Sequence, residues 1–191
     1  MNGSDQILVA YGTKHGATAE IAEAIGKVLR DAGLEVDVER ARGVGSVERY
    51  RAVVLGSAVY AGRWRGDAMR LLRRPELKDR DVWLFSSGPV GEDKGDPADV
   101  ERWTKPQQVR DLEAGIGVHE HVVFGGKVDE DAGFIRKKMA RNTPPELRDR
   151  RDWEQIEAWG RSIAGALAPT SVARSPEASP GPARPDRARR S

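Results

Sequence analysis

The sequence predicts a doubly wound α/β domain, in which helices cover both faces of a five-stranded parallel sheet. Apolar stretches of strand length alternate with amphipathic stretches of helix length along most of the chain, and this alternation is typical of a parallel sheet. The stretch at 51–59, RAVVLGSAV, is a long apolar run, as expected for a strand buried on both faces. The 191 residues are enough for one such domain with a full hydrophobic core.

Each element is predicted by its own local pattern. In the first helix Ile21, Ile25 and Leu29 fall on one face at helical spacing, and Gly33 ends the helix. The stretch LEVDVERA alternates apolar and polar residues as a strand does. The expected strands are 6–11, 34–41, 51–59, 80–86 and 119–126, and the expected helices are 17–32, 66–74, 106–115 and one beginning near Asp152.

The chain is expected to hold one folded domain at 1–167 and a disordered tail at 168–191. The tail is rich in proline, alanine, serine and arginine, so it cannot bury enough apolar surface to offset its ordering entropy. It carries five arginines against two acidic residues, a net charge of +3. Because the whole chain carries +2, the body carries −1. A weak contact of the tail with anionic lipid or RNA is the alternative to a solvated tail.

The composition excludes several kinds of chemistry. There is no cysteine, which removes disulfides, iron–sulfur clusters, thiolate metal sites and cysteine nucleophiles, so redox chemistry requires a bound organic cofactor. Three histidines are too few for a His-rich metal site, and no metal is expected. The near-neutral body argues against nucleic-acid binding. With no secretory signal and no transmembrane-length apolar run, the expected location is the cytoplasm.

The loop after the first predicted strand has the composition of an anion site. It is rich in small and hydroxyl-bearing residues and leads directly into the first helix, whose N-terminus attracts negative charge. Its glycine spacing matches neither the P-loop nor the dinucleotide fingerprint. The alternative is an ordinary helix start capped by Thr13 or Thr18. The loop residues expected around a phosphate are Thr13, Lys14, His15, Gly16, Ala17 and Thr18.

Two more loops leave the carboxyl ends of predicted strands, where doubly wound sheets bind ligands. Tyr60 and Trp64 in the second loop suit stacking on a flat heterocycle, with core packing or a covered sheet edge as the alternative. In the third loop the glycines allow close backbone approach, with a plain turn as the alternative. The candidate binding residues are Ser57, Ala58, Val59, Tyr60, Ala61, Gly62 and Trp64, followed by Ser86, Ser87, Gly88, Pro89, Val90 and Gly91.

The pattern Tyr11-x-Thr13-x-x-Gly16-x-Thr18-x-x-x-Ala22-x-x-Ile25 resembles the phosphate loop of the flavodoxin family. The resemblance covers about 5–167 and implies a flavodoxin-like fold that binds FMN, with the phosphate held mostly by backbone groups of the first loop. It also implies that the flavin carries the redox chemistry, so no catalytic side chain is expected. A deazaflavin in place of FMN is left open, as is a flavodoxin fold without a cofactor.

Two short motifs are similar to the flavodoxin-type, menaquinone-dependent protoporphyrinogen dehydrogenases. They are Phe124-Gly125-Gly126-Lys127 and Asp152-Trp153-Glu154-Gln155-Ile156. The resemblance implies a porphyrinogen substrate and a quinone acceptor, although the 127–151 connection shares little with that subfamily. Within this connection 134–141 resembles a short basic amphipathic helix, read first as a packed helix with a solvated side and alternatively as a membrane-facing surface. Conceivable contacts for acidic propionates are Arg63, Arg65, Lys137 and Arg141.

The sequence is thus consistent with two functions. The first is an FMN oxidoreductase with a small-molecule substrate such as a porphyrinogen, and the second is an electron carrier that serves a redox protein. Carrier flavodoxins are strongly acidic, which argues for the first. Receiver chemistry is excluded because Tyr11–Gly12 and Ser57–Ala58 stand where it needs aspartates. Peripheral contact with the inner face of a membrane is an alternative location, and the oligomeric state is left open.

Overall fold

The computed structural model describes residues 5–88, 104–127 and 148–168. Within these ranges no helix is long and apolar enough to cross a membrane. In chain order the elements are β1 (Ile7–Gly12), α1 (Ala17–Asp31), β2 (Val36–Arg40), β3 (Ala52–Tyr60), β4 (Arg63–Trp64), α2 (Gly66–Leu72), the 3₁₀ helix η1 (Pro75–Asp79), β5 (Asp81–Gly88), α4 (Gln107–Ile116), β6 (Val118–Gly125) and α6 (Trp153–Leu167).

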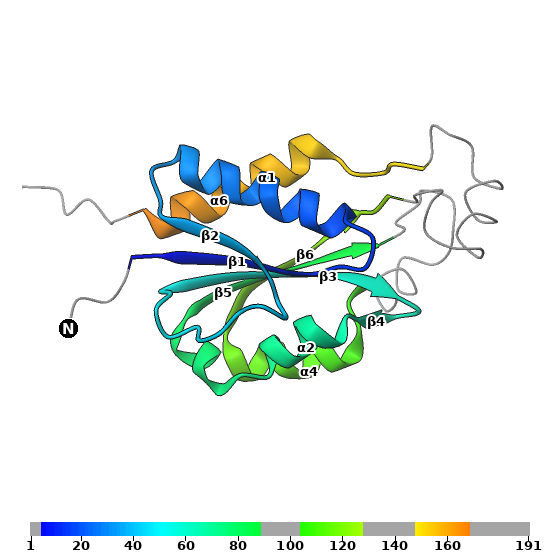
Figure 1. Ribbon diagram of the computed structural model, residues 1–191, viewed down its shortest axis with the longest axis horizontal. Coiled ribbons are helices and arrows are strands. Elements are labelled where there is room, and N and C mark those ends of the chain that lie inside the picture. The colour runs from blue at the N-terminus through cyan, green and yellow to red at the C-terminus, as the bar shows by residue number, and fades with distance from the viewer. Residues whose placement is uncertain (1–4, 89–103, 128–147, 169–191) are drawn as a thin grey trace, which may run out of the picture.

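The sheet is parallel with the strand order β2-β1-β3-β5-β6, which confirms the predicted doubly wound fold (Figure 1). The chain moves from β1 outward to β2 and then crosses to β3 on the other side of β1. A sixth strand, β4, pairs antiparallel with β3 and was not predicted. Because β4 has two residues, its sequence carries no period-2 signal, and its strand character comes from the tertiary pairing alone.

Two hydrophobic cores lie on opposite faces of the sheet (Figure 1). Successive side chains of β1 alternate between them, with Ile7 and Val9 facing α1 and α6, and Leu8 and Ala10 facing α2 and α4. All four are fully buried, as the predicted apolar run of a central parallel strand requires. The helices therefore fix the sheet from both sides and leave its carboxyl edge to the loops.

The element boundaries differ from the predictions by a few residues. The helix expected at 66–74 ends at Leu72, and η1 takes over at Pro75, whose ring cannot continue an α-helix. The last helix begins at Trp153, as expected, because Asp152 caps it by accepting a 3.0 Å hydrogen bond from the Gln155 amide. The predictions made for 89–91, 134–141 and 169–191 lie outside the described residues.

Candidate functional site

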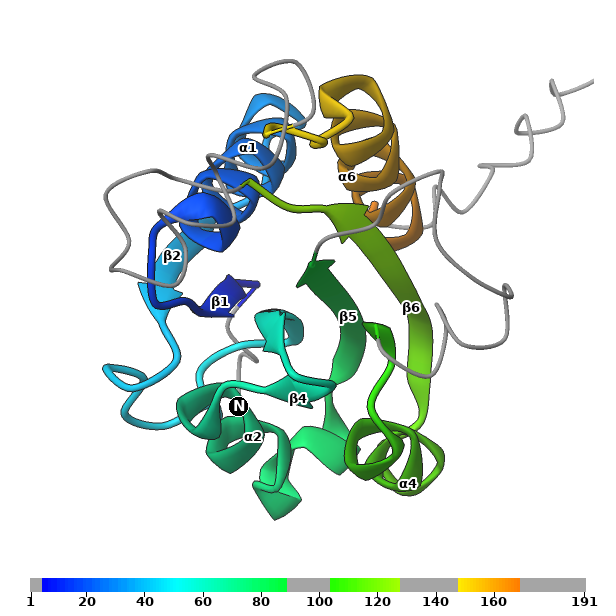
Figure 2. The ribbon, with the colours of Figure 1, turned by 90° about the vertical axis from the view of Figure 1, so that its right-hand side faces the viewer.

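The three loops singled out by the sequence start from neighbouring strand ends. In the ladder Gly12 is opposite Ser57, Ser57 is opposite Ser86, and Gly88 is opposite Gly125. Figure 2 looks onto this carboxyl edge, with the ends of β1, β3 and β5 in the middle and the helices around them. The topological switch point lies here, between β1 and β3, which is where doubly wound folds bind ligands.

The first loop turns sharply around Gly16. Its φ of 98° is left-handed, and a Cβ there would meet no described atom within 4 Å, so backbone conformation and not crowding favours glycine. The Gly16 amide donates to Thr13 Oγ1 at 3.1 Å, which closes the turn. Thr13 and Thr18 are buried, whereas Lys14 is exposed. The threonines therefore shape the loop from inside.

The N-terminus of α1 has Gly16 at the cap position, and no side chain of the described residues caps it. This arrangement differs from the alternative in which Thr13 or Thr18 caps the helix. The amides of the first turn carry the positive end of the helix dipole, and backbone groups of this kind bind phosphate without a cationic side chain. The loop thus has the geometry and the donors of an anion site.

The second loop is a tight hairpin between β3 and β4. Tyr60 pairs with Arg63, and the two residues between them, Ala61 and Gly62, have φ of 49° and 67°. Positive φ at both central positions is typical of the type I′ hairpin turn. Alanine rarely adopts this conformation, and such backbone strain is concentrated at functional sites.

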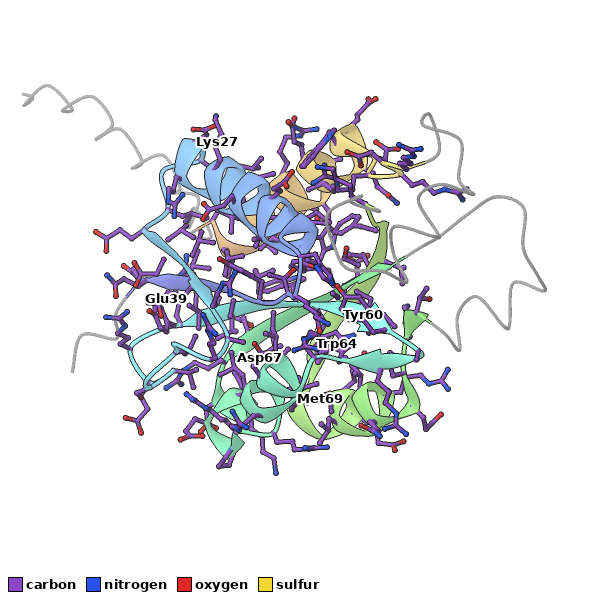
Figure 3. All side chains as sticks on the ribbon, turned by 45° about the vertical axis from the view of Figure 1, so that its right-hand side comes forward. Lys27, Glu39, Tyr60, Trp64, Asp67 and Met69 are labelled. Atoms are coloured by element: carbon purple, nitrogen blue, oxygen red, sulfur yellow. The ribbon has the colours of Figure 1, made fainter. Side chains whose placement is uncertain are left out.

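Tyr60 connects the second loop to the first. Its ring centroid lies 6.2 Å from that of His15, with the two planes 72° apart, and the Arg65 guanidinium lies 6.0 Å from the Tyr60 centroid. Figure 3 shows Tyr60 at the outer end of β3 and Trp64 deeper, between the sheet and α2. Because Tyr60 is half-buried at the rim, it has the position that stacking on a flat ligand needs.

Other predicted site residues have their side chains in the interior. Trp64 is 6% exposed and donates its indole N–H to Ser86 Oγ at 2.8 Å, which favours the core-packing alternative for this residue. The Ser57 hydroxyl accepts from the Arg65 amide at 2.9 Å and donates to the Ala58 carbonyl. Ala58, Val59, Ser86 and Ser87 are buried as well. Because these side chains are buried, only the backbone groups of these residues are available to contact a ligand.

A segment after β6 closes the site on the side of α1. Lys127 forms a bridge with Asp149, and the Arg150 amide donates to the Gly126 carbonyl at 3.1 Å. Arg151 is 4% exposed and lies 2.6 Å from both Asp149 and Glu20. Its hydrogen bond to Asp149 lowers the pKa of that carboxyl, and the two carboxylates raise the pKa of Arg151. Arg151 thereby ties this segment to the first turn of α1.

Sequence reasoning missed Arg151 and also His121, whose ring joins a buried hydrogen-bond chain under the third loop. Neither residue belongs to a local motif, since Arg151 stands in a run of charged residues and His121 in an ordinary strand pattern. Their partners come from other elements. His121 is the third residue of the predicted strand 119–126, so its position in the sequence gave no signal.

This geometry defines a class of protein, a doubly wound α/β domain with a phosphate-type loop at the switch point and an aromatic side chain beside it. A family model described as "Flavodoxin domain" matches residues 8–142. The chain belongs to this family, and the resemblance drawn from the first loop is confirmed at the level of the family.

Solved structures share the fold at low sequence identity. A flavodoxin from the domain Archaea has a TM-score of 0.57 and 14% identity, covering 85% of this chain and 98% of its own. Flavodoxin 2 from Bacillus cereus has a TM-score of 0.56 and 19% identity, covering 84% and 99%. Rubredoxin oxygen:oxidoreductase from Desulfovibrio gigas has a TM-score of 0.55 and 15% identity, covering 86% of this chain and 36% of that one.

A flavodoxin domain implies FMN as the cofactor, and the residues present fit that group. The start of α1 offers amides that no described side chain caps. No atom of the described part of the chain fills the space beside Gly16, and the ring of Tyr60 stands at the rim of the same edge. A loop with the donors that an anion site needs and an aromatic side chain therefore lie at one edge, which fits a phosphate-bearing flat heterocycle.

Proposed function

We propose that this protein is an FMN-dependent redox protein in which the first loop, Thr13–Thr18, holds the phosphate. In this proposal Tyr60 flanks the ring, and the second and third loops meet its edges through their backbones. Bound FMN supplies the two-electron chemistry, and the chain supplies position, stacking and hydrogen bonds. No side chain of the loops is assigned a catalytic role.

One observation carries the proposal. His15 of the first loop and Tyr60 of the second are 6.2 Å apart, at a helix start that no described side chain caps. The anion-binding and stacking functions are thus joined at one edge of the sheet. The buried hydroxyl of Thr13, bonded to the Gly16 amide, supports the turn from behind.

The test is a visible absorption spectrum of the protein before and after addition of FMN and gel filtration. Flavin bands that stay with the protein support the proposal, and a protein that takes up no FMN overturns it. Exchange of both Thr13 and Thr18 for alanine should weaken binding, whereas exchange for serine, which keeps both hydroxyls, should preserve most of it. Far-UV circular dichroism checks that each variant is folded.

For the substrate, we infer oxidation of protoporphyrinogen IX with a quinone as acceptor. In each of three two-electron steps the porphyrinogen loses a hydride and a proton, and one quinone gains the electron pair and two protons. The two short motifs at 124–127 and 152–156 support this inference, together with the near-neutral body. Arginines near the second loop, Arg63 and Arg65, suit the acidic propionates. The cytoplasm, with contact at a membrane that holds the quinone, is the matching location.

The alternative is an electron carrier that serves a redox protein. Size supports this alternative. The match covers 98% of the archaeal flavodoxin, so the fold of this chain is as large as that flavodoxin. Anaerobic turnover separates the two functions. An oxidoreductase converts many equivalents of protoporphyrinogen to fluorescent protoporphyrin when a menaquinone analogue is present. A carrier is reduced by a flavodoxin reductase and shows no such turnover.

A further inference from the structure

Four side chains from four elements form a continuous hydrogen-bond chain beneath the second and third loops. Trp64 Nε1 of β4 lies 2.8 Å from Ser86 Oγ of β5, which lies 2.9 Å from His121 Nε2 of β6. His121 Nδ1 in turn contacts Glu113 Oε1 of α4. Ser86 is fully buried, the His121 side chain is 4% exposed, and Glu113, at 23%, is the end nearest solvent. We name these four residues the relay.

The hydrogens of the relay can be placed from its chemistry. The indole N–H of Trp64 only donates, so Ser86 Oγ accepts from it. An ionised Glu113 only accepts, so His121 carries its hydrogen on Nδ1 and presents a bare Nε2 to Ser86. The Ser86 hydroxyl then donates to Nε2, and every bond runs the same way, from Trp64 to Glu113.

The opposite tautomer of His121 is unfavourable. It would place an unprotonated Nδ1 against the Glu113 carboxylate. It would also turn the Nε2 hydrogen toward Ser86, and among the described residues no other group is within hydrogen-bond distance to accept the hydrogen of that hydroxyl. A buried donor left without a partner is costly. Glu113 therefore determines how the whole relay is oriented.

The order serine, histidine, carboxylate is that of a hydrolytic triad, but the surroundings exclude this role. A nucleophilic hydroxyl must reach a substrate carbonyl. Ser86 is 0% exposed, and its oxygen already accepts from Trp64. The ring of His121 is also covered by Trp64, with centroids 5.6 Å apart at 79°. The relay is thus a structural device.

We propose that Glu113 is a positioning residue for the flavin site. Acting through His121 and Ser86, it holds Trp64, and with it the strained hairpin that carries Tyr60, against the strand that leads into the third loop. The inference rests on the proposed function, because it takes the hairpin and the carboxyl end of β5 as walls of the flavin site. Support comes from register, since Trp64 pairs with Val59 in the strand that ends at Tyr60.

The chain offers a matched control on the other face of the same strand. Glu120 precedes His121 and accepts a 2.7 Å hydrogen bond from the indole of Trp159, among the α1 and α6 residues. Glu113→Leu and Glu120→Leu thus each remove a carboxylate from a network that ends in a tryptophan. The conservative variants Glu113→Gln and His121→Gln keep an acceptor at the relevant place in the relay.

The first measurement uses the flavin-free protein and ¹⁵N NMR. We expect the Nδ1–H tautomer of His121 in the wild type. Glu113→Leu should shift the Trp64 indole resonance, whereas Glu120→Leu should leave it in place. An Nε2–H tautomer in the wild type overturns the proposed orientation, and an unmoved Trp64 resonance in Glu113→Leu overturns the coupling. Both readouts are independent of the proposed flavin site.

The second measurement is the dissociation constant for FMN. Glu113→Leu should raise it about tenfold, the effect of losing roughly one buried hydrogen bond, whereas Glu113→Gln, His121→Gln and Glu120→Leu should change it by less than about threefold. Equal losses in Glu113→Leu and Glu120→Leu, or no loss in Glu113→Leu, overturn the positioning role. A wild type that binds no FMN overturns the proposed function and this role together, while the NMR result still judges the relay.

Discussion

The carboxyl and amino edges of the sheet differ in how their backbone groups are satisfied. At the carboxyl edge the helix start is uncapped by described side chains, Ala61 is held at positive φ, and loops begin with small and hydroxyl-bearing residues. At the amino edge and the loops beside it, arginine side chains bond the exposed carbonyls. Arg51 donates to Leu167 O at 2.8 Å, Arg74 to Val44 O at 2.8 Å, and Arg80 to Glu48 O at 3.1 Å.

The difference indicates that the amino edge contributes to stability, and it supports the proposal that the carboxyl edge receives a ligand. These charged donors satisfy carbonyls at the end of α6 and in the loop between β2 and β3. At the carboxyl edge no described side chain caps the amides of the first turn of α1, so these donors are available to a ligand. Some of the arginines that make this flavodoxin domain less acidic than a carrier are therefore used internally and do not form a docking surface.

Both edges depend on the same core, so a core truncation should have the largest effect. Ile163 of α6 is fully buried, and Ile163→Ala should lower the free energy of unfolding by about 2–5 kcal/mol. Glu157→Ala, on the exposed side of the same helix, should change it by less than about 0.5 kcal/mol. Urea denaturation measures both, and similar values for the two variants would contradict the assigned packing.

The two ends of α1 provide a matched pair of glycines that distinguishes the carboxyl edge from the rest of the fold. Gly16 and Gly33 both have positive φ, 98° and 85°, with open space where a Cβ would stand. Alanine at either position should cost about 1–2 kcal/mol of stability through backbone strain. Gly16→Ala should in addition raise the FMN dissociation constant about tenfold, since a distorted loop presents its amides poorly.

Gly33→Ala is the control for the phosphate loop, because it has the same strain at the far end of the helix. Its FMN dissociation constant should stay at the wild-type value. Fluorescence titration of FMN gives both numbers. Equal affinity in Gly16→Ala and Gly33→Ala would remove the first loop from the flavin site and leave the fold unaffected.

Substitutions at the amino edge should change the stability of the protein and leave its affinity for FMN unchanged. Arg74→Met removes the donors from Val44 O and Gly45 O, and we expect a loss of about 1 kcal/mol because these carbonyls are partly exposed. Arg70→Met, at an exposed position of α2, should be neutral. Thermal melts and FMN titrations together check this. A change in FMN affinity in Arg74→Met would break the division between the two edges.

The smallest effect is expected from pH at the segment after β6. Hydrogen bonding from Arg151 lowers the pKa of Asp149 from its ordinary 3.8, so its stabilisation is complete above that value and is lost as the pH falls below it. The Asp149 side chain is 42% exposed, so solvent screens the interaction and the contribution is below about 1 kcal/mol. The stability difference between wild type and Asp149→Asn should thus shrink from pH 7 to pH 3, and a constant difference would contradict the pairing.

The sequence was most informative where function and fold share one local pattern. The first helix, the buried strands and the start of the last helix near Asp152 follow from apolar spacing, and family membership followed from the Thr13–Thr18 loop. The site residues stay predictions, although the structure brings His15 and Tyr60 together. His15 and Tyr60 are close because β1 and β3 are neighbours in the sheet. A single sequence predicts that strand order only when the fold class is known.

The remainder was unpredictable for a physical reason. Trp64 was read as a stacking candidate from its place in the loop, whereas its 6% exposure follows from a two-residue strand that exists only through pairing with β3. His121 and Arg151 act through partners far along the chain, Ser86 and Glu20. No local periodicity reports such pairs.

The bridge between Lys127 and Asp149 brings together two residues that are far apart in the sequence. The ends of the intervening sequence are joined by the domain itself, through the Gly126–Arg150 hydrogen bond. Closing a longer loop between fixed ends costs only about 0.6 kcal/mol for each doubling of its length. A longer or shorter sequence between Lys127 and Asp149 therefore changes the free energy of folding by little, because the bridge fixes its two ends.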